Sequence, residues 1–285
     1  MDESIESSTL PLVAGARARG GRPTQQDAFV CLHDRGEDAR LLVLADGMGG
    51  DGAGELASAG VVDTARALWA QGQWRELPPA LFLERLCQDA HTELRRRGAG
   101  VAHGEPHSTV VALLLRGDRA SWAHVGDSRL YRFRGRRCLD RTEDHSVAQH
   151  KLRRGELTED ALAHDPDQHK LLRGLGGPQA PKVDHGFATL QPGQSFALCS
   201  DGVWESLSSA ELGAYASRWQ AEAAVHAALR LALQRGGADG DNLALILVRV
   251  GWAQWLRRGV GQWLTVLGGS RRRAVAAQSS GESRQ

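Results

Sequence analysis

The chain has 285 residues, of which 41% are hydrophobic, and this share is enough for a buried core in one or two domains. Its 35 basic and 34 acidic residues leave a net charge of +1, which excludes a general nucleic-acid binder and a basic membrane-surface protein. Four widely spaced cysteines without a C-x-x-C pair exclude a zinc ribbon and favour reduced thiols. The N-terminus lacks the pattern of a secretory signal, and no stretch reaches the roughly 18 apolar residues of a membrane span. We therefore expect a soluble, cytoplasmic monomer.

The first half of the chain is predicted to begin with a flexible, polar segment over residues 1–9. An apolar run over 41–45 predicts a buried strand, which ends at Asp46 and is followed by three glycines within four residues. Helices are expected over 53–70 and 79–97, from their composition and, in the second, from apolar residues at three- and four-residue steps. Further strands are expected over 10–19, 28–32, 108–115, 120–125 and 130–133.

The second half begins with a change of pattern. Residues 144–177 contain short helical pieces and charged connections between strands, so we interpret them as a mobile flap of the same domain. Its histidines are spaced by 5, 14 and 5 residues, which matches no zinc pattern, and we predict that they are solvated or capping: His145, His150, His164 and His169. Later strands are predicted over 182–190, 194–198 and 243–250, with helices over 208–217 and 220–234.

Four aspartates lie at predicted strand ends beside glycine or in a glycine-rich loop: Asp46, Asp127, Asp201 and Asp241. We expect them to converge, and carboxylates so close together repel one another unless cations neutralise them. Ligands that offer only oxygen favour Mg²⁺ or Mn²⁺ over zinc, and two such ions can activate a water for attack on phosphorus. With Arg22 as a phosphate clamp, the pattern predicts a phosphomonoester hydrolase.

Five motifs in this order resemble the metal-dependent serine/threonine protein phosphatases (type 2C, PPM). They are Arg22…Gln26-Asp27, Asp46-Gly47-Met48-Gly49-Gly50, Gly126-Asp127-Ser128-Arg129, Ser200-Asp201-Gly202 and Asp241-Asn242. The resemblance covers about residues 10–250, as a single catalytic domain. It implies an α+β fold, a four-layer α-β-β-α sandwich with two antiparallel sheets flanked by helices. Met48 and Asp144-His145-Ser146 resemble the bacterial branch, whose members partner serine/threonine kinases.

The resemblance also implies an activity and a set of roles. The activity is hydrolysis of phosphoserine and phosphothreonine in proteins at a binuclear Mn²⁺ or Mg²⁺ centre, with a weaker third ion. For the metals, Asp46 resembles the carboxylate that bridges both core ions, and the Gly47 carbonyl resembles a ligand of the second ion. Asp201 and Asp241 resemble ligands of the first ion. Asp127, together with Asp201, resembles the site of the third ion. For the reaction, Asp27 resembles a residue that orients metal-bound water, and Arg22 the phosphate-binding arginine. Asn242 is expected to support the site.

Two positions depart from the family pattern. Gln26 stands where many members have Glu, so one contact to the second metal would be neutral or water-mediated. Met48 replaces the histidine that is the suspected general acid of many eukaryotic members. Because the sequence offers no obvious proton donor at that point, protonation of the leaving group by water is a hypothesis.

Two alternatives stay open at this stage. A pseudophosphatase of the same fold would bind phosphoproteins without hydrolysis, but Asp46, Asp201 and Asp241 are all present, which favours catalysis. A metal-dependent phosphatase that acts on small molecules would share the same core chemistry, and only the flap could distinguish it.

The family pattern does not cover the C-terminal extension, residues 251–273, which is rich in Trp and Arg. Its apolar residues fall on one helical face: Trp252, Trp255, Leu256, Val260, Trp263, Leu264 and Leu267. Such a face over 252–267 suits an anionic membrane surface or a partner groove, and packing on the domain's own sheet is the alternative. Residues 274–285 are small and polar, and we expect them to be disordered.

Overall fold

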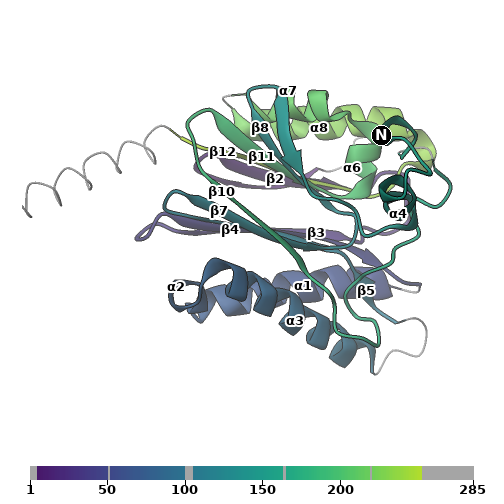
Figure 1. Cartoon of the computed structure of the whole chain (residues 1–285), viewed down its shortest axis with the longest axis horizontal. Helices are drawn as coiled ribbons and strands as arrows, with labels where there is room; N and C mark the ends of the chain where they lie inside the picture. Colours follow the sequence, from purple (N-terminus) through teal and green to yellow (C-terminus); the bar gives the residue numbers. More distant parts are fainter. Residues whose placement is uncertain (1–4, 51, 100–104, 163–164, 219, 252–285) are drawn as a thin grey trace, which may run out of the picture.

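Two antiparallel sheets stack face to face, and helices cover both outer faces (Figure 1). The computed structural model describes residues 5–50, 52–99, 105–162, 165–218 and 220–251. This arrangement confirms the predicted four-layer α-β-β-α sandwich.

Each sheet is named here by its strands in spatial order. The first sheet runs β1 (Glu6–Leu10), β2 (Val13–Ala18), β12 (Leu243–Arg249), β11 (Gln194–Cys199), β8 (Arg129–Arg134) and β9 (Arg137–Arg141). The second runs β10 (Asp184–Thr189), β7 (Arg119–Val125), β6 (Val110–Arg116), β4 (Ala39–Met48) and β3 (Asp27–Asp34), with β5 (His107–Ser108) paired to β4.

The helices divide between the two faces (Figure 1). The second sheet is covered by α1 (Ala53–Ala70), α2 (Gln73–Glu76) and α3 (Pro79–Gly98). The first is covered by α6 (Asp201–Ser206), α7 (Ser209–Ala216) and α8 (Ala221–Gly236), which the short 3-10 helix η1 (Gly237–Asp239) follows. The predicted flap contains α4 (Val147–Arg153) and α5 (Glu159–Leu162).

The side chains of strand β4 pack on both faces of the second sheet and so join two layers of the core. Side chains alternate across a strand, so Leu41 and Val43 pack against the helices below the sheet, whereas Leu42 and Leu44 enter the layer between the two sheets. All four are fully buried. By the same alternation, Asp46 continues the row of Leu42 and Leu44 and faces the space between the sheets.

The structure corrects the start of the chain. Residues 1–9 were expected to be flexible, but Glu6–Leu10 forms β1, which pairs with β2 from Glu6↔Arg17 to Leu10↔Val13. Leu12 adopts a positive φ of 65° and turns the predicted strand over 10–19 into a hairpin. The polar residues of β1 gain their stability from these ladder bonds and from the 2.6 Å ion pair of Arg17 with Glu6, which give no hydrophobic signal.

The extension over 252–273 and the tail over 274–285 lie outside the described residues. Within the described part, no helix is long and apolar enough to cross a membrane.

Candidate metal centre

A cleft of about 300 Å³ opens at the end of the sandwich where the predicted aspartates lie. Its lining comes from both sheets and from the flap: Arg22, Gln26, Asp46, Gly47, Met48, Gly49, Asp127, His169, Leu171, Asp201, Asp241 and Asn242. The topology explains this convergence. Strands β4, β7 and β11 end at this edge of the sandwich, while β3, β8 and β12 begin there.

Asp46 and Asp27 lie directly opposite each other on β4 and β3. The backbone of Asp46 is fixed by Thr109, whose hydroxyl accepts its N–H at 3.0 Å and whose N–H donates to its carbonyl at 2.8 Å. Gly47 comes next, and a Cβ at this position would lie 1.8 Å from the carbonyl oxygen of Gly54. A glycine is therefore required where the chain passes the start of α1.

Asp27 is oriented by Ser200, a residue of the Ser200-Asp201-Gly202 motif to which the sequence assigned no role of its own. The Ser200 hydroxyl accepts the N–H of Ala244 at 2.9 Å, so its own proton is donated to Asp27 Oδ2, 2.7 Å away. The other oxygen, Oδ1, is buried and has no hydrogen-bond partner among the described residues. Oδ2 of Asp27 is therefore held by a hydrogen bond, whereas Oδ1 has none among the described residues.

Asp201 and Asp241 lie beside strands of the first sheet, just after β11 and just before β12. Asp201 is the first residue of α6, and its Oδ1 accepts the N–H of Gly202 at 2.7 Å. Asp241 precedes β12, and its Oδ2 accepts a hydrogen bond of 2.7 Å from Arg22. Arg22 is half exposed, so it lies at the rim of the cleft with donors to spare.

Asn242 organises the loop that carries Arg22 and Gln26. Its side-chain amide donates to the carbonyls of Arg19 and Thr24 at 2.7 and 2.9 Å, and its oxygen accepts the N–H of Gln26 at 2.7 Å. Gln26 itself contacts the carbonyl of Gly49 through its amide at 3.4 Å. The supporting position expected for Asn242 thus has a structural basis in these three hydrogen bonds.

Asp127 lies buried between β7 and β8. The indole N–H of Trp204 donates to its carbonyl at 3.0 Å, and the Arg129 guanidinium stacks over that indole at 3.5 Å. Arg129 also makes a bidentate, buried ion pair with Asp144, at 2.8 and 2.6 Å. The start of the flap is thereby tied to the backbone of Asp127.

The buried carboxyls of the cleft repel one another when they are ionised. Burial, followed by repulsion from neighbouring carboxylates, raises the pKa of Asp27, Asp46 and Asp127 well above the usual range. Among the neighbouring carboxylates, Asp201 has the largest repulsive effect on the pKa of Asp46 and of Asp127. Divalent cations that bind oxygen would remove this repulsion, so the donor set fits Mg²⁺ or Mn²⁺. The individual roles of the carboxylates as ligands stay predictions.

Two further side chains lie beside Asp201: His169, which was predicted to be solvated or capping, and Glu205, which the sequence did not single out. His169 Nδ1 lies 3.8 Å from Asp201 Oδ2 and 3.6 Å from Glu205 Oε1. Asp201 and Glu205 raise the pKa of His169 to about 9, and burial raises that of Glu205 to about 7. Glu205 follows Asp201 by one helical turn, a spacing that would have revealed it had α6 been predicted.

The flap histidines correct another expectation. His145 was predicted to be solvated or capping, yet its side chain is 2% exposed. Its Nδ1 accepts the N–H of Gly126 at 3.1 Å, and its Nε2 lies 3.2 Å from Asp184 and 3.3 Å from Arg173. These partners are distant in sequence, so spacing alone could not show that the ring is buried. His150 is exposed, as expected, and His169 is exposed but lies beside Asp201, while His164 lies outside the described residues.

Comparison with known proteins identifies the class of this chain. The family model for protein phosphatase 2C matches residues 14–235. The chain belongs to this family, and the expected enzyme class, a phosphatase, is confirmed.

Individual relatives agree with the family. The serine/threonine phosphatase stp of Listeria innocua is 33% identical over 178 residues, which cover 60% of this chain and 69% of the relative. The structure of PppA, described as a key regulatory component of the T6SS in Pseudomonas aeruginosa, is 32% identical and has a TM-score of 0.63, covering 83% of this chain and 96% of PppA. The catalytic domain of PstP, solved with two manganese ions, is 25% identical with a TM-score of 0.69, covering 83% and 96% of the two chains.

Proposed function

We propose that this protein hydrolyses phosphoserine and phosphothreonine in proteins and opposes a serine/threonine kinase. One observation carries the proposal: four buried or half-buried aspartates from the two halves of the sandwich line one cleft that has an arginine at its rim, and a fifth, Asp27, lies opposite Asp46. Such a cluster stays ionised at neutral pH only around cations, and the family is metal-dependent.

The residues divide into metal ligands and groups that act on the substrate. Asp46, the Gly47 carbonyl, Asp201 and Asp241 would hold two Mn²⁺ or Mg²⁺ ions, and Asp127 with Asp201 a weaker third. When bound, the ions supply Lewis-acid activation of a water and neutralise charge on the phosphoryl oxygens. This oxygen-only donor set is the one that these ions prefer.

The chain's own side chains bind and orient the reactants. Arg22 reaches the rim with several N–H donors unused, and it can bind two phosphoryl oxygens at once. Asp27 Oδ1 is free to accept a hydrogen bond from the attacking water, while Ser200 holds the other oxygen. The Met48 thioether lines the cleft but carries no proton, so protonation of the leaving alkoxide by water stays part of the proposal.

The test is hydrolysis of an aryl phosphate and of a phosphothreonine peptide with Mn²⁺, with Mg²⁺ and with chelator. We expect no turnover with chelator and a loss of about 100-fold or more in kcat for Asp201→Asn, because several kcal/mol of charge stabilisation disappear. Asp239→Asn, an exposed aspartate of η1, is the matched control and should keep full activity.

Each alternative has its own outcome in this experiment. Turnover that survives chelation, or full activity in Asp201→Asn, would refute the metal mechanism. Tight binding of the peptide without hydrolysis would indicate the regulatory module. Hydrolysis of the aryl phosphate without hydrolysis of any of several phosphopeptides would indicate a small-molecule phosphatase.

A further inference from the structure

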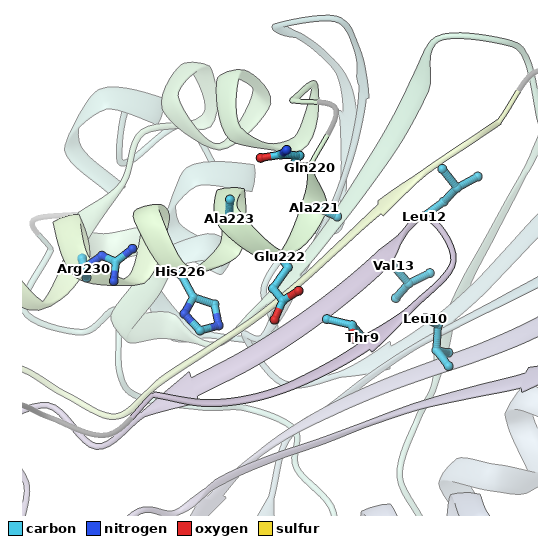
Figure 2. A pocket seen from close by; sticks show the side chains of 10 residues that line it. All are labelled: Thr9, Leu10, Leu12, Val13, Gln220, Ala221, Glu222, Ala223, His226 and Arg230. Carbon is cyan, nitrogen blue, oxygen red and sulfur yellow. The ribbon is translucent and has the colours of Figure 1, made fainter.

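A groove of about 570 Å³ lies between the β1–β2 hairpin and α8 (Figure 2). It is at the opposite end of β12 from the carboxylate cleft, because it adjoins the C-terminal end of that strand and the start of β2. One side is the β1–β2 hairpin with Thr9 and Leu12, and the other is α8 with Glu222, Ala223 and His226 (Figure 2).

The described chain leaves the sheet at the edge of this groove. The N–H of Arg249 donates to the carbonyl of Leu12 at 2.9 Å, and a Cβ on Gly251 would lie 2.7 Å from Leu12 Cδ1. Trp252 is the next residue, and 34 residues follow Gly251 (285 minus 251). Since an extended chain spans about 3.5 Å per residue, Trp252 and Trp255 are within about 14 Å of Gly251.

The chemistry of the groove suits an indole. The His226 imidazole lines the groove, and its buried Nε2 atom has no hydrogen-bond partner in the described part of the chain. Tryptophan combines a large apolar ring with a single N–H donor, which suits a groove where the apolar side chains of Leu12 and Ala223 lie among polar ones. The sequence from 252 to 267 supplies three such residues on one predicted face: Trp252, Trp255 and Trp263.

We propose that residues 252–267 dock into this groove of their own chain. Tethering favours this occupant over a second copy, because a short connection gives an effective concentration in the millimolar range, far above ordinary protein concentrations. Docking would remove the tryptophan face from water. The proposal stands apart from the phosphatase activity, since the groove and the cleft share no residue.

The test measures how fast trypsin removes the extension at Arg257 or Arg258 from the full-length protein, followed by intact mass. Ala223→Glu places a charge in the groove at an exposed helical position, where glutamate is a good helix former and should leave the fold intact. We expect it to speed cleavage by about tenfold, since cleavage follows the undocked population. Gln234→Glu, an exposed position of α8 outside the groove, should cleave like the wild type.

Three outcomes would overturn the proposal. The first is an equal rate of cleavage in all three proteins. The second is a dimer in sedimentation velocity that Ala223→Glu converts to monomer, because the occupant would then be a second copy. The third is binding of the wild type to phosphatidylglycerol vesicles that depends on the extension and is unaffected by Ala223→Glu, which would assign the tryptophans to a membrane.

Discussion

The buried ion pair of Arg129 and Asp144 makes a quantitative prediction about stability. Both side chains are less than 10% exposed, and the two carboxylate oxygens each accept a guanidinium hydrogen bond. Asp144→Asn keeps the shape but leaves the Arg129 charge uncompensated beneath the stacked ring of Trp204. Breaking a buried pair in this way costs about 3–5 kcal/mol.

This free energy converts into a measurable shift of Tm. Unfolding entropy is about 2.1 cal/mol/K per residue, so a domain of about 240 residues has about 0.5 kcal/mol/K. A loss of about 4 kcal/mol therefore lowers Tm by about 8 °C. Differential scanning calorimetry of Asp144→Asn measures it directly, under one fixed metal concentration.

The control is an exposed pair on α3. Arg85 and Asp89 are 3.2 Å apart, four residues along the helix, and about half exposed. Asp89→Asn should cost at most about 0.5 kcal/mol, which is about 1 °C. If Asp144→Asn lowers Tm no more than Asp89→Asn does, the inference that the buried charge pair anchors the flap is wrong.

Two further predictions concern the site and its pH dependence. Ser200→Ala frees Asp27 Oδ2 and should lower kcat by about 10-fold or more, with KM within about twofold. The control Ser195→Ala removes a buried hydroxyl that lacks a partner among the described residues, and it should not lower kcat. Equal losses of kcat in steady-state assays would count against the orienting role of Ser200. Burial lowers the pKa of His145 to about 4, below its unfolded value of about 6.5. The contribution of the neutral ring to the free energy of unfolding is therefore complete above pH 6.5 and is lost as the pH falls toward 4. Urea unfolding at pH 7 and pH 5 should show about 2 kcal/mol less acid destabilisation in His145→Gln than in the wild type, and identical pH responses would contradict this.

The parts of the fold that could be predicted are those that local pattern determines. The apolar run 41–45 and the glycines after Asp46 revealed β4 and its turn, because burial on both faces leaves a continuous hydrophobic signal. Helix α1 was predicted with the observed bounds, Ala53–Ala70. Helix α6 was missed because six residues are too few for a period of 3.6 to emerge, and its absence hid Glu205.

The rest of the site depends on tertiary contacts that no spacing encodes. Ser200 orients Asp27 across 173 positions of sequence, through the stacking of the two sheets. His169 reaches Asp201 from the flap, whose path the sequence does not specify. Their types, serine and histidine, occur on most surfaces, so composition could not distinguish them from solvated residues.

The division of the cleft between the two sheets has a consequence for assembly. Asp46 and Asp27 belong to one half of the sandwich, while Asp201 and Asp241 belong to the other. An ion bound by carboxylates from both halves would link the two sheets and would stabilise their packing at that end. If these carboxylates hold the ions as proposed, a nascent chain would have no working site until both halves are complete and have stacked, and the architecture would prevent premature activity during synthesis.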